Sequence, residues 1–102
     1  MPKYALVWSR QADQELDDIV DYIAEQNPWA AIEFAREVEK KTLLLQEHPQ
    51  MYRPSIYKRG YRYMLIGNYL FLYKAVSEDR TVKVMRVLHG ARDIATALGE
   101  NT

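Results

Sequence analysis

The feature that most constrains the fold of this chain is a change of hydrophobic periodicity near Pro49. Before this residue, apolar side chains recur at the three- and four-residue spacing of amphipathic helices. After it, aromatic and β-branched residues form short runs separated by turn residues, which is typical of strands. A chain of 102 residues can build one hydrophobic core but not two. The pattern therefore predicts a single α+β domain over residues 1–102, in which helices from the first half cover a sheet from the second.

The boundaries of the expected elements follow from capping and turn residues. Ser9 can cap a first helix, and Asn27-Pro28 supplies an N-cap and a first-turn proline for a second. Gly67-Asn68 suits a two-residue hairpin turn. The expected elements are a strand over 3–8, helices over 9–27 and 28–48, strands over 61–66, 69–76 and 81–88, and an optional short strand over 55–58. The prediction is a helix hairpin packed on one face of a small twisted antiparallel sheet, in the order β-α-α-β-β-β with a short C-terminal helical turn.

Composition argues against several kinds of site. The chain is 48% hydrophobic and 27% charged, as in ordinary globular proteins. It has no run near the roughly 20 apolar residues that span a bilayer, so no membrane association is expected. It has no cysteine, and only His48 and His89 could act as imidazole ligands. We therefore expect a cytoplasmic domain with no metal site and no cofactor.

The net charge is zero, but the charges are divided between the two halves of the chain. Residues 1–49 carry ten acidic and five basic residues, whereas residues 50–93 carry nine basic and three acidic ones. Such a division indicates either an anion-binding face or an internal electrostatic match. Asp13, Asp17 and Asp21 recur every four residues on the first helix. A solvated face explains them better than an acidic patch for a partner.

Tyrosines and basic residues alternate over residues 52–73. This composition suits either base stacking with phosphate contacts or a half-buried sheet, and the sheet is favoured. Arg62 and Arg86 lie inside predicted strands, where long charged side chains need a reason. If Arg62 shares a face with Met64 and Ile66, its guanidinium has to reach solvent, pair with an acid or line a cleft.

The stretch that closes the last strand contains His89 followed by Gly90, which permits a turn with positive φ. A lone histidine here is more often structural. With Arg86 and Arg92 nearby, His89 becomes a candidate for a phosphate site.

Four segments carry a resemblance to a known family when they occur in this order: VWSRQADQELDDIVDYIAEQNPWAA, EHPQMYRP, RGYRYMLIGNYLFLYKA and VMRVLHGARD. Over nearly its whole length, the chain resembles toxins of the RelE/ParE superfamily of type II toxin–antitoxin modules. The resemblance implies a helix hairpin on a twisted antiparallel sheet, which agrees with the hydrophobic pattern. In this superfamily, RelE-like members cleave mRNA in the ribosomal A site. ParE-like members lack the nuclease residues and poison DNA gyrase.

The residues that distinguish these branches favour the ParE-like one. By resemblance, Arg62 and Arg92 match transition-state cations of RelE-like nucleases, with His89 as a possible base or acid. Arg53 and Ser55 stand where those enzymes carry lysines, and the C-terminal segment has no tyrosine. Arginine stays protonated and is a poor general base. The predicted function is a bacterial or plasmid-borne toxin that inhibits DNA gyrase. The alternatives are a RelE-like mRNA endoribonuclease and an inactive binding module that acts as a co-repressor.

The resemblance also implies partners. These are a cognate antitoxin that folds onto the toxin, operator DNA contacted only through the antitoxin, and DNA gyrase, or the ribosome and mRNA in the alternative. Trp8, Trp29, Leu43 and Leu44 are surplus apolar residues that could dock an amphipathic helix. For Trp29 a place in the core is slightly favoured. The candidate binding residues are Arg53, Lys58, Arg59, Arg86 and Trp29.

Overall fold

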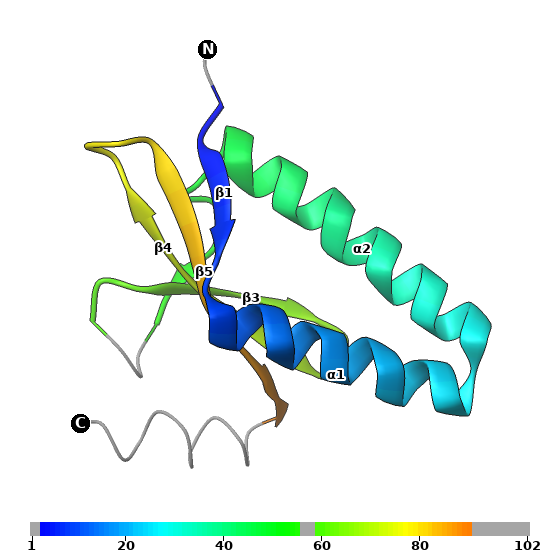
Figure 1. Cartoon of the computed structure of the whole chain (residues 1–102). Coiled ribbons are helices and arrows are strands. Elements are labelled where there is room, and N and C mark those ends of the chain that lie inside the picture. Colours follow the sequence, from blue (N-terminus) through cyan, green and yellow to red (C-terminus); the bar gives the residue numbers. More distant parts are fainter. Residues whose placement is uncertain (1–2, 56–58, 91–102) are drawn as a thin grey trace.

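The computed structural model describes residues 3–55 and 59–90 and has two helices and five strands in this part of the chain (Figure 1). The elements are β1 (Ala5–Trp8), α1 (Arg10–Gln26), α2 (Pro28–Glu47), β2 (Arg53–Pro54), β3 (Arg62–Ile66), β4 (Tyr69–Val76) and β5 (Thr81–His89). The α+β class and the helix hairpin are therefore confirmed. The expected C-terminal helical turn lies outside the described residues. Neither described helix is long and apolar enough to cross a membrane.

The sheet is mixed, which differs from the expected antiparallel arrangement. Its strand order is β1-β5-β4-β3-β2, and β1 runs parallel to β5 while the other neighbours are antiparallel. A parallel neighbour needs a long connection, and here the helices and three strands lie between β1 and β5 in the chain. The optional strand over 55–58 is replaced by the two-residue β2, which pairs with the first two residues of β3. Residues 56–58 lie outside the described part.

Side chains at the two helix starts cap the helices as predicted. The Ser9 hydroxyl accepts a hydrogen bond from the Ala12 amide at 3.0 Å. The Asn27 side-chain oxygen accepts from the Trp29 and Ala30 amides at 3.0 and 3.3 Å. These local contacts satisfy amides that a helix leaves unpaired at its first turn, so the hairpin of helices is defined by residues next to each other in sequence.

Both helices pack on one face of the sheet (Figure 1). The Trp8 ring joins the core between them and meets Phe71 edge-to-face at 6.3 Å, so it is not free for docking. Because side chains alternate along a strand, Leu70, Leu72 and Leu88 lie on the opposite face. There they form a second, smaller cluster. The main core consists of Ala12, Val38, Leu45, Met64, Ile66, Phe71, Tyr73, Val82, Val84 and Val87.

On the side away from β4, the second half of β5 has α1 as its neighbour instead of a strand. β1 pairs with β5 only as far as Val84, and the pairing with β4 then slips by one residue, which leaves Met85 as a bulge. The Ser9 hydroxyl donates to the Met85 carbonyl at 2.9 Å, and the Glu15 carboxylate accepts from the Val87 amide at 2.8 Å. Two side chains at the start of α1 therefore close this sheet edge.

Candidate functional site

Arg62 lies in a shallow pocket at the β2–β3 edge. The pocket has a volume of about 260 Å³ and is lined by Pro54, Ser55, Arg59, Gly60, Tyr61 and Arg62. Gly60 has φ of 85°, which lets the chain turn into β3. The half-buried Arg62 donates from Nη1 to the Tyr52 carbonyl at 2.7 Å. In the described part of the chain no carboxylate lies within ion-pair distance of Arg62, so no acidic side chain offsets the guanidinium that lines this cleft.

Tyr73 stands opposite Arg62 in the sheet and is completely buried. Its hydroxyl has no hydrogen-bond partner among the described residues. Burial raises the pKa of Tyr73 to about 12, although the nearby Tyr52 backbone and the Arg62 guanidinium act to lower it. At pH 7 a phenol with that pKa is ionised in only about one molecule in 10⁵. Tyr73 therefore cannot serve as a general base beside Arg62.

His89 lies at the other end of the sheet. It pairs with Tyr69 on β4, whereas Arg62 pairs with Tyr73, four residues further along the same strand. At the rise of an extended strand, these positions are about 13 Å apart. The structure therefore does not bring Arg62 and His89 into one reaction centre. In residues 3–55 and 59–90 no three histidine or acidic side chains gather as a metal would require.

Arg86 is engaged by Glu15 of α1. Its Nη2 and Nε donate to the carboxylate at 2.8 to 3.2 Å, and each side chain keeps only 21% of its exposure. Glu15, the acid that pairs with this strand arginine, therefore lies 71 positions earlier in the chain. Glu15 did not stand out in the sequence, because it is one of several acidic residues on a helix that was expected to be solvated.

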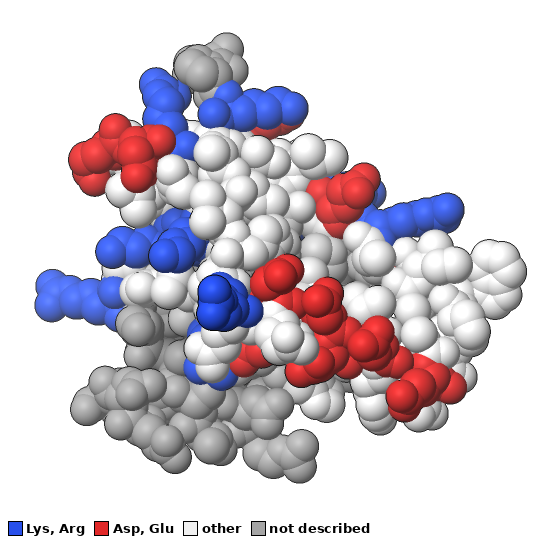
Figure 2. Space-filling view, viewed as in Figure 1, with Lys and Arg blue, Asp and Glu red and all other residues white. Residues whose placement is uncertain are grey.

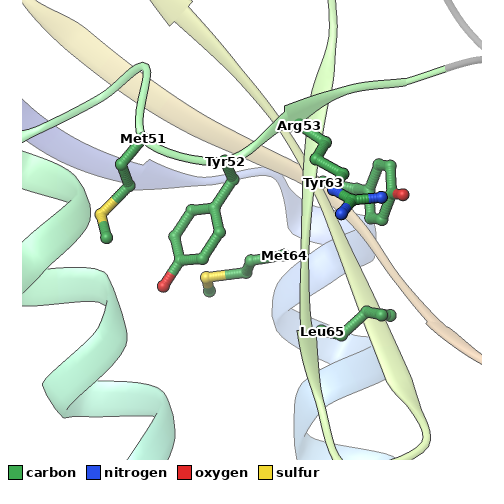
Figure 3. A pocket seen from close by; sticks show the side chains of 6 residues that line it. All are labelled: Met51, Tyr52, Arg53, Tyr63, Met64 and Leu65. Carbon is green, nitrogen blue, oxygen red and sulfur yellow. The ribbon is translucent and has the colours of Figure 1, made fainter.

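A larger cavity of about 500 Å³ lies between the segment before β2 and the edge of β3 (Figure 3). Tyr52 extends towards Met64, with Met51 on its far side, while Arg53 lies beside the Tyr63 ring (Figure 3). Leu65, which also lines it, is 54% exposed. Because β2 pairs only with the start of β3, the outer edge from Met64 onward has no strand neighbour in the described part.

The sequence did not single out the apolar part of this cavity. The available signal was Leu65, which stands between two buried residues of a strand and so must face away from the main core.

Trp29 is 75% exposed near the turn between the helices, so the interpretation as a core anchor is wrong. One amphipathic helix needs only one buried stripe, and Ala31, Val38 and Leu45 provide it on α2. Trp29 remains a candidate binding residue. Leu43 and Leu44 are also exposed. Two other candidates, Lys58 and Arg92, lie outside the described residues.

Acidic and basic side chains gather on different parts of the surface. Figure 2 shows an acidic band that follows α1, with Lys and Arg side chains mainly at the left and top of this view. In the described part of the chain, the pair of Arg86 and Glu15 is the one ion pair between α1 and the sheet. The acidic residues of α1 are therefore not paired with the basic residues of the sheet along the whole helix. Most of the acids on α1 remain solvated. They are Asp13, Asp17, Asp18, Asp21 and Glu25.

Comparisons with known proteins identify the family. Residues 6–94 match the family described as ParE toxin of type II toxin-antitoxin system, parDE. Toxin ParE1 of Caulobacter vibrioides is 35% identical over 95 residues, which cover 89% of this chain and 94% of that protein.

Solved structures share the fold. A chain of the chromosomal ParDE system of P. aeruginosa has a TM-score of 0.72 at 19% identity, covering 86% of this chain and 97% of that one. A chain of the RelBE2 complex of Mycobacterium tuberculosis has a TM-score of 0.63 at 25% identity, covering 89% and 95%. The protein therefore belongs to the ParE toxin family of type II toxin–antitoxin systems, within the RelE/ParE superfamily.

Proposed function

We propose that this protein is a ParE-like toxin that inhibits DNA gyrase by binding it and is neutralised by a cognate antitoxin. The observation that carries the proposal is the separation of Arg62 from His89 across β4. Cleavage of RNA through its 2′-hydroxyl needs a base and a cation at the same phosphate. In the described part of the chain, the titratable neighbour opposite Arg62 is Tyr73, which stays protonated. A binding role accounts for this arrangement better than catalysis does.

The relatives support the same choice. Toxin ParE1 of Caulobacter vibrioides matches this chain over 94% of its own length, so the similarity extends over the whole domain. The structural neighbours were solved as ParDE and RelBE toxin–antitoxin systems, which supports a cognate antitoxin as partner. In this proposal operator DNA is contacted only through the antitoxin.

One observation favours the RelE-like alternative. Arg62 is an unneutralised cation in a cleft that Arg59 also lines, and Arg53 stands next to that cleft in β2. Such a group of cations is suited to an RNA phosphate. In that case the base would come from elsewhere than Tyr73 or His89.

The test uses the purified protein without antitoxin in two assays. One measures supercoiling by DNA gyrase with a check for cleaved DNA, and the other maps mRNA ends by primer extension in a translating extract. Inhibited supercoiling with intact mRNA is expected, and added antitoxin should restore supercoiling. Arg62→Ala and Lys83→Ala each remove one positive charge, and only the first alters the cleft.

Codon-positioned mRNA cuts with normal supercoiling would overturn the proposal. Arg62→Ala should then abolish cutting while Lys83→Ala should not. No effect in either assay would leave the inactive binding module as the function.

A further inference from the structure

A third cavity lies between α1 and the ends of β4 and β5, away from the Arg62 cleft. It has a volume of about 360 Å³ and is lined by Asp18, Ile19, Tyr22, Tyr69 and His89. We call it the α1 cavity.

Aromatic rings form the walls of the α1 cavity. Tyr69 is half-buried and held from two sides, since Phe34 meets it edge-to-face at 5.3 Å and His89 lies against it at 4.9 Å. Tyr22 comes from α1 and is 59% exposed. Both Tyr22 and Tyr69 line the cavity. Burial, and then the proximity of Tyr22, raises the pKa of Tyr69. The cavity therefore has one fixed wall and one accessible ring.

Among the described residues that line the α1 cavity, Asp18 supplies a carboxylate. Asp18 accepts a hydrogen bond from the uncharged Gln14 amide at 2.9 Å, which leaves its charge in place. None of the basic side chains in residues 3–55 and 59–90 lies within ion-pair distance of Asp18. Asp18 lies on α1, and the acidic band along this helix (Figure 2) adds to the attraction of a cation.

Aromatic faces beside a carboxylate form a favourable site for an organic cation. The guanidinium group suits this combination best, because its plane stacks on a phenol ring while its N–H groups pair with a carboxylate. A compact ammonium would pair with Asp18 but could not stack. We propose that the α1 cavity binds the side chain of an arginine presented by the cognate antitoxin. This rests on the proposed function, which supplies the antitoxin as partner.

The preference of the α1 cavity for a guanidinium is tested first with a small probe on the isolated full chain. Nα-acetyl-arginine amide is titrated while the ring signals of Tyr22, Tyr69 and His89 are followed by NMR. Saturable shifts of all three are expected, and Nα-acetyl-citrulline amide, which has the same shape without charge, should cause none. Equal responses to the two probes, or a stronger response to Nα-acetyl-lysine amide, would overturn the assignment to a guanidinium.

The antitoxin itself is then titrated by calorimetry against two matched variants. Asp18→Asn removes the carboxylate in the α1 cavity, and Asp17→Asn removes the same charge from the same helix outside it. Both residues are exposed, so both variants should fold. We expect Asp18→Asn to weaken binding about tenfold, the loss typical of one charge-assisted contact, and Asp17→Asn by less than about twofold.

The outcomes separate this inference from the proposed function. Failure of the wild-type chain to bind the antitoxin would refute the proposed function. Normal binding that Asp18→Asn leaves unchanged, or that both variants weaken equally, would refute only the arginine site.

Discussion

Removing the Glu15 carboxylate should destabilise the fold far more than its place on a charged helix suggests. Glu15→Ala deletes the acceptor for the Arg86 guanidinium and for the Val87 amide at once. A hydrogen bond to a charged group contributes about 1.5–3 kcal/mol, and an amide left unpaired in the interior costs about 1–3 kcal/mol. Since the Glu15 and Arg86 side chains retain 21% exposure, water can replace part of the loss. We expect the free energy of unfolding to fall by about 3 kcal/mol.

The measurement is urea denaturation followed by far-UV circular dichroism at pH 7. The slope of stability against urea should stay unchanged, because the same surface is exposed, while the midpoint falls by about 1–3 M. Asp17→Ala is the matched control. Asp17 is exposed two residues away and has no hydrogen-bond or ion-pair partner in the described part of the chain, so its loss should cost less than about 0.5 kcal/mol.

Two further variants separate the contributions. Glu15→Gln keeps an acceptor for Val87 but loses the charge, so its stability should fall between wild type and Glu15→Ala. A double-mutant cycle of Glu15→Ala with Arg86→Ala should give a coupling energy of about 1–3 kcal/mol. If Glu15→Ala proved no more damaging than Asp17→Ala, then α1 would not close the edge of β5. Arg86 would then be free to act as one of the candidate binding residues.

Four further changes test other parts of the fold. Ser9→Ala removes both the cap of α1 and the donor to the Met85 carbonyl and should cost about 1–2 kcal/mol in urea denaturation. Leu45→Ala should cost about 2–5 kcal/mol, because Leu45 is fully buried. Gly67→Ala should lower the melting temperature, because φ is 58° there. Tyr73→Phe should be neutral or stabilising at pH 7, since the hydroxyl is unpaired among the described residues. The raised pKa of Tyr73 favours the neutral phenol in the fold, so wild-type stability should fall between about pH 10 and pH 12, and less steeply in Tyr73→Phe.

The helix hairpin could be predicted from the sequence because its determinants are local. Ser9 and Asn27 cap the helices that follow them directly, and the apolar stripes repeat within single helices. The hairpin of β3 and β4 is local in the same way, since Gly67-Asn68 sets its register. Each of these features depends on residues that lie close together in the sequence.

Features that join distant segments could not be predicted in this way. The direction of β1 is decided by β5, its neighbour 76 positions away in the sequence, and nothing in the pattern of a short strand reports the direction of its neighbour. The partner of Arg86 is likewise 71 residues away. The exposure of Trp29 depends on how α2 is rotated on the sheet, and the helix offered more apolar residues than its buried face could hold.

One long-range feature did leave a signal in the sequence. In β5, Val82 and Val84 alternate as a strand requires, but the next residue of the main core is Val87 rather than residue 86. A spacing of three instead of two means that one residue is extra, and the bulge at Met85 is that residue. Without it, Arg86 would point into the main core beneath the helices. With it, Val87 fills the core, and the Arg86 guanidinium reaches Glu15 at the sheet edge. The same slip sets His89 opposite Tyr69 and turns its side chain to the helix-covered face, so the bulge also places the histidine in the α1 cavity. Arg62 of β3 pairs with Tyr73 and His89 of β5 pairs with Tyr69, so whether the two form one site is decided by strand register and not by which residue types the chain contains.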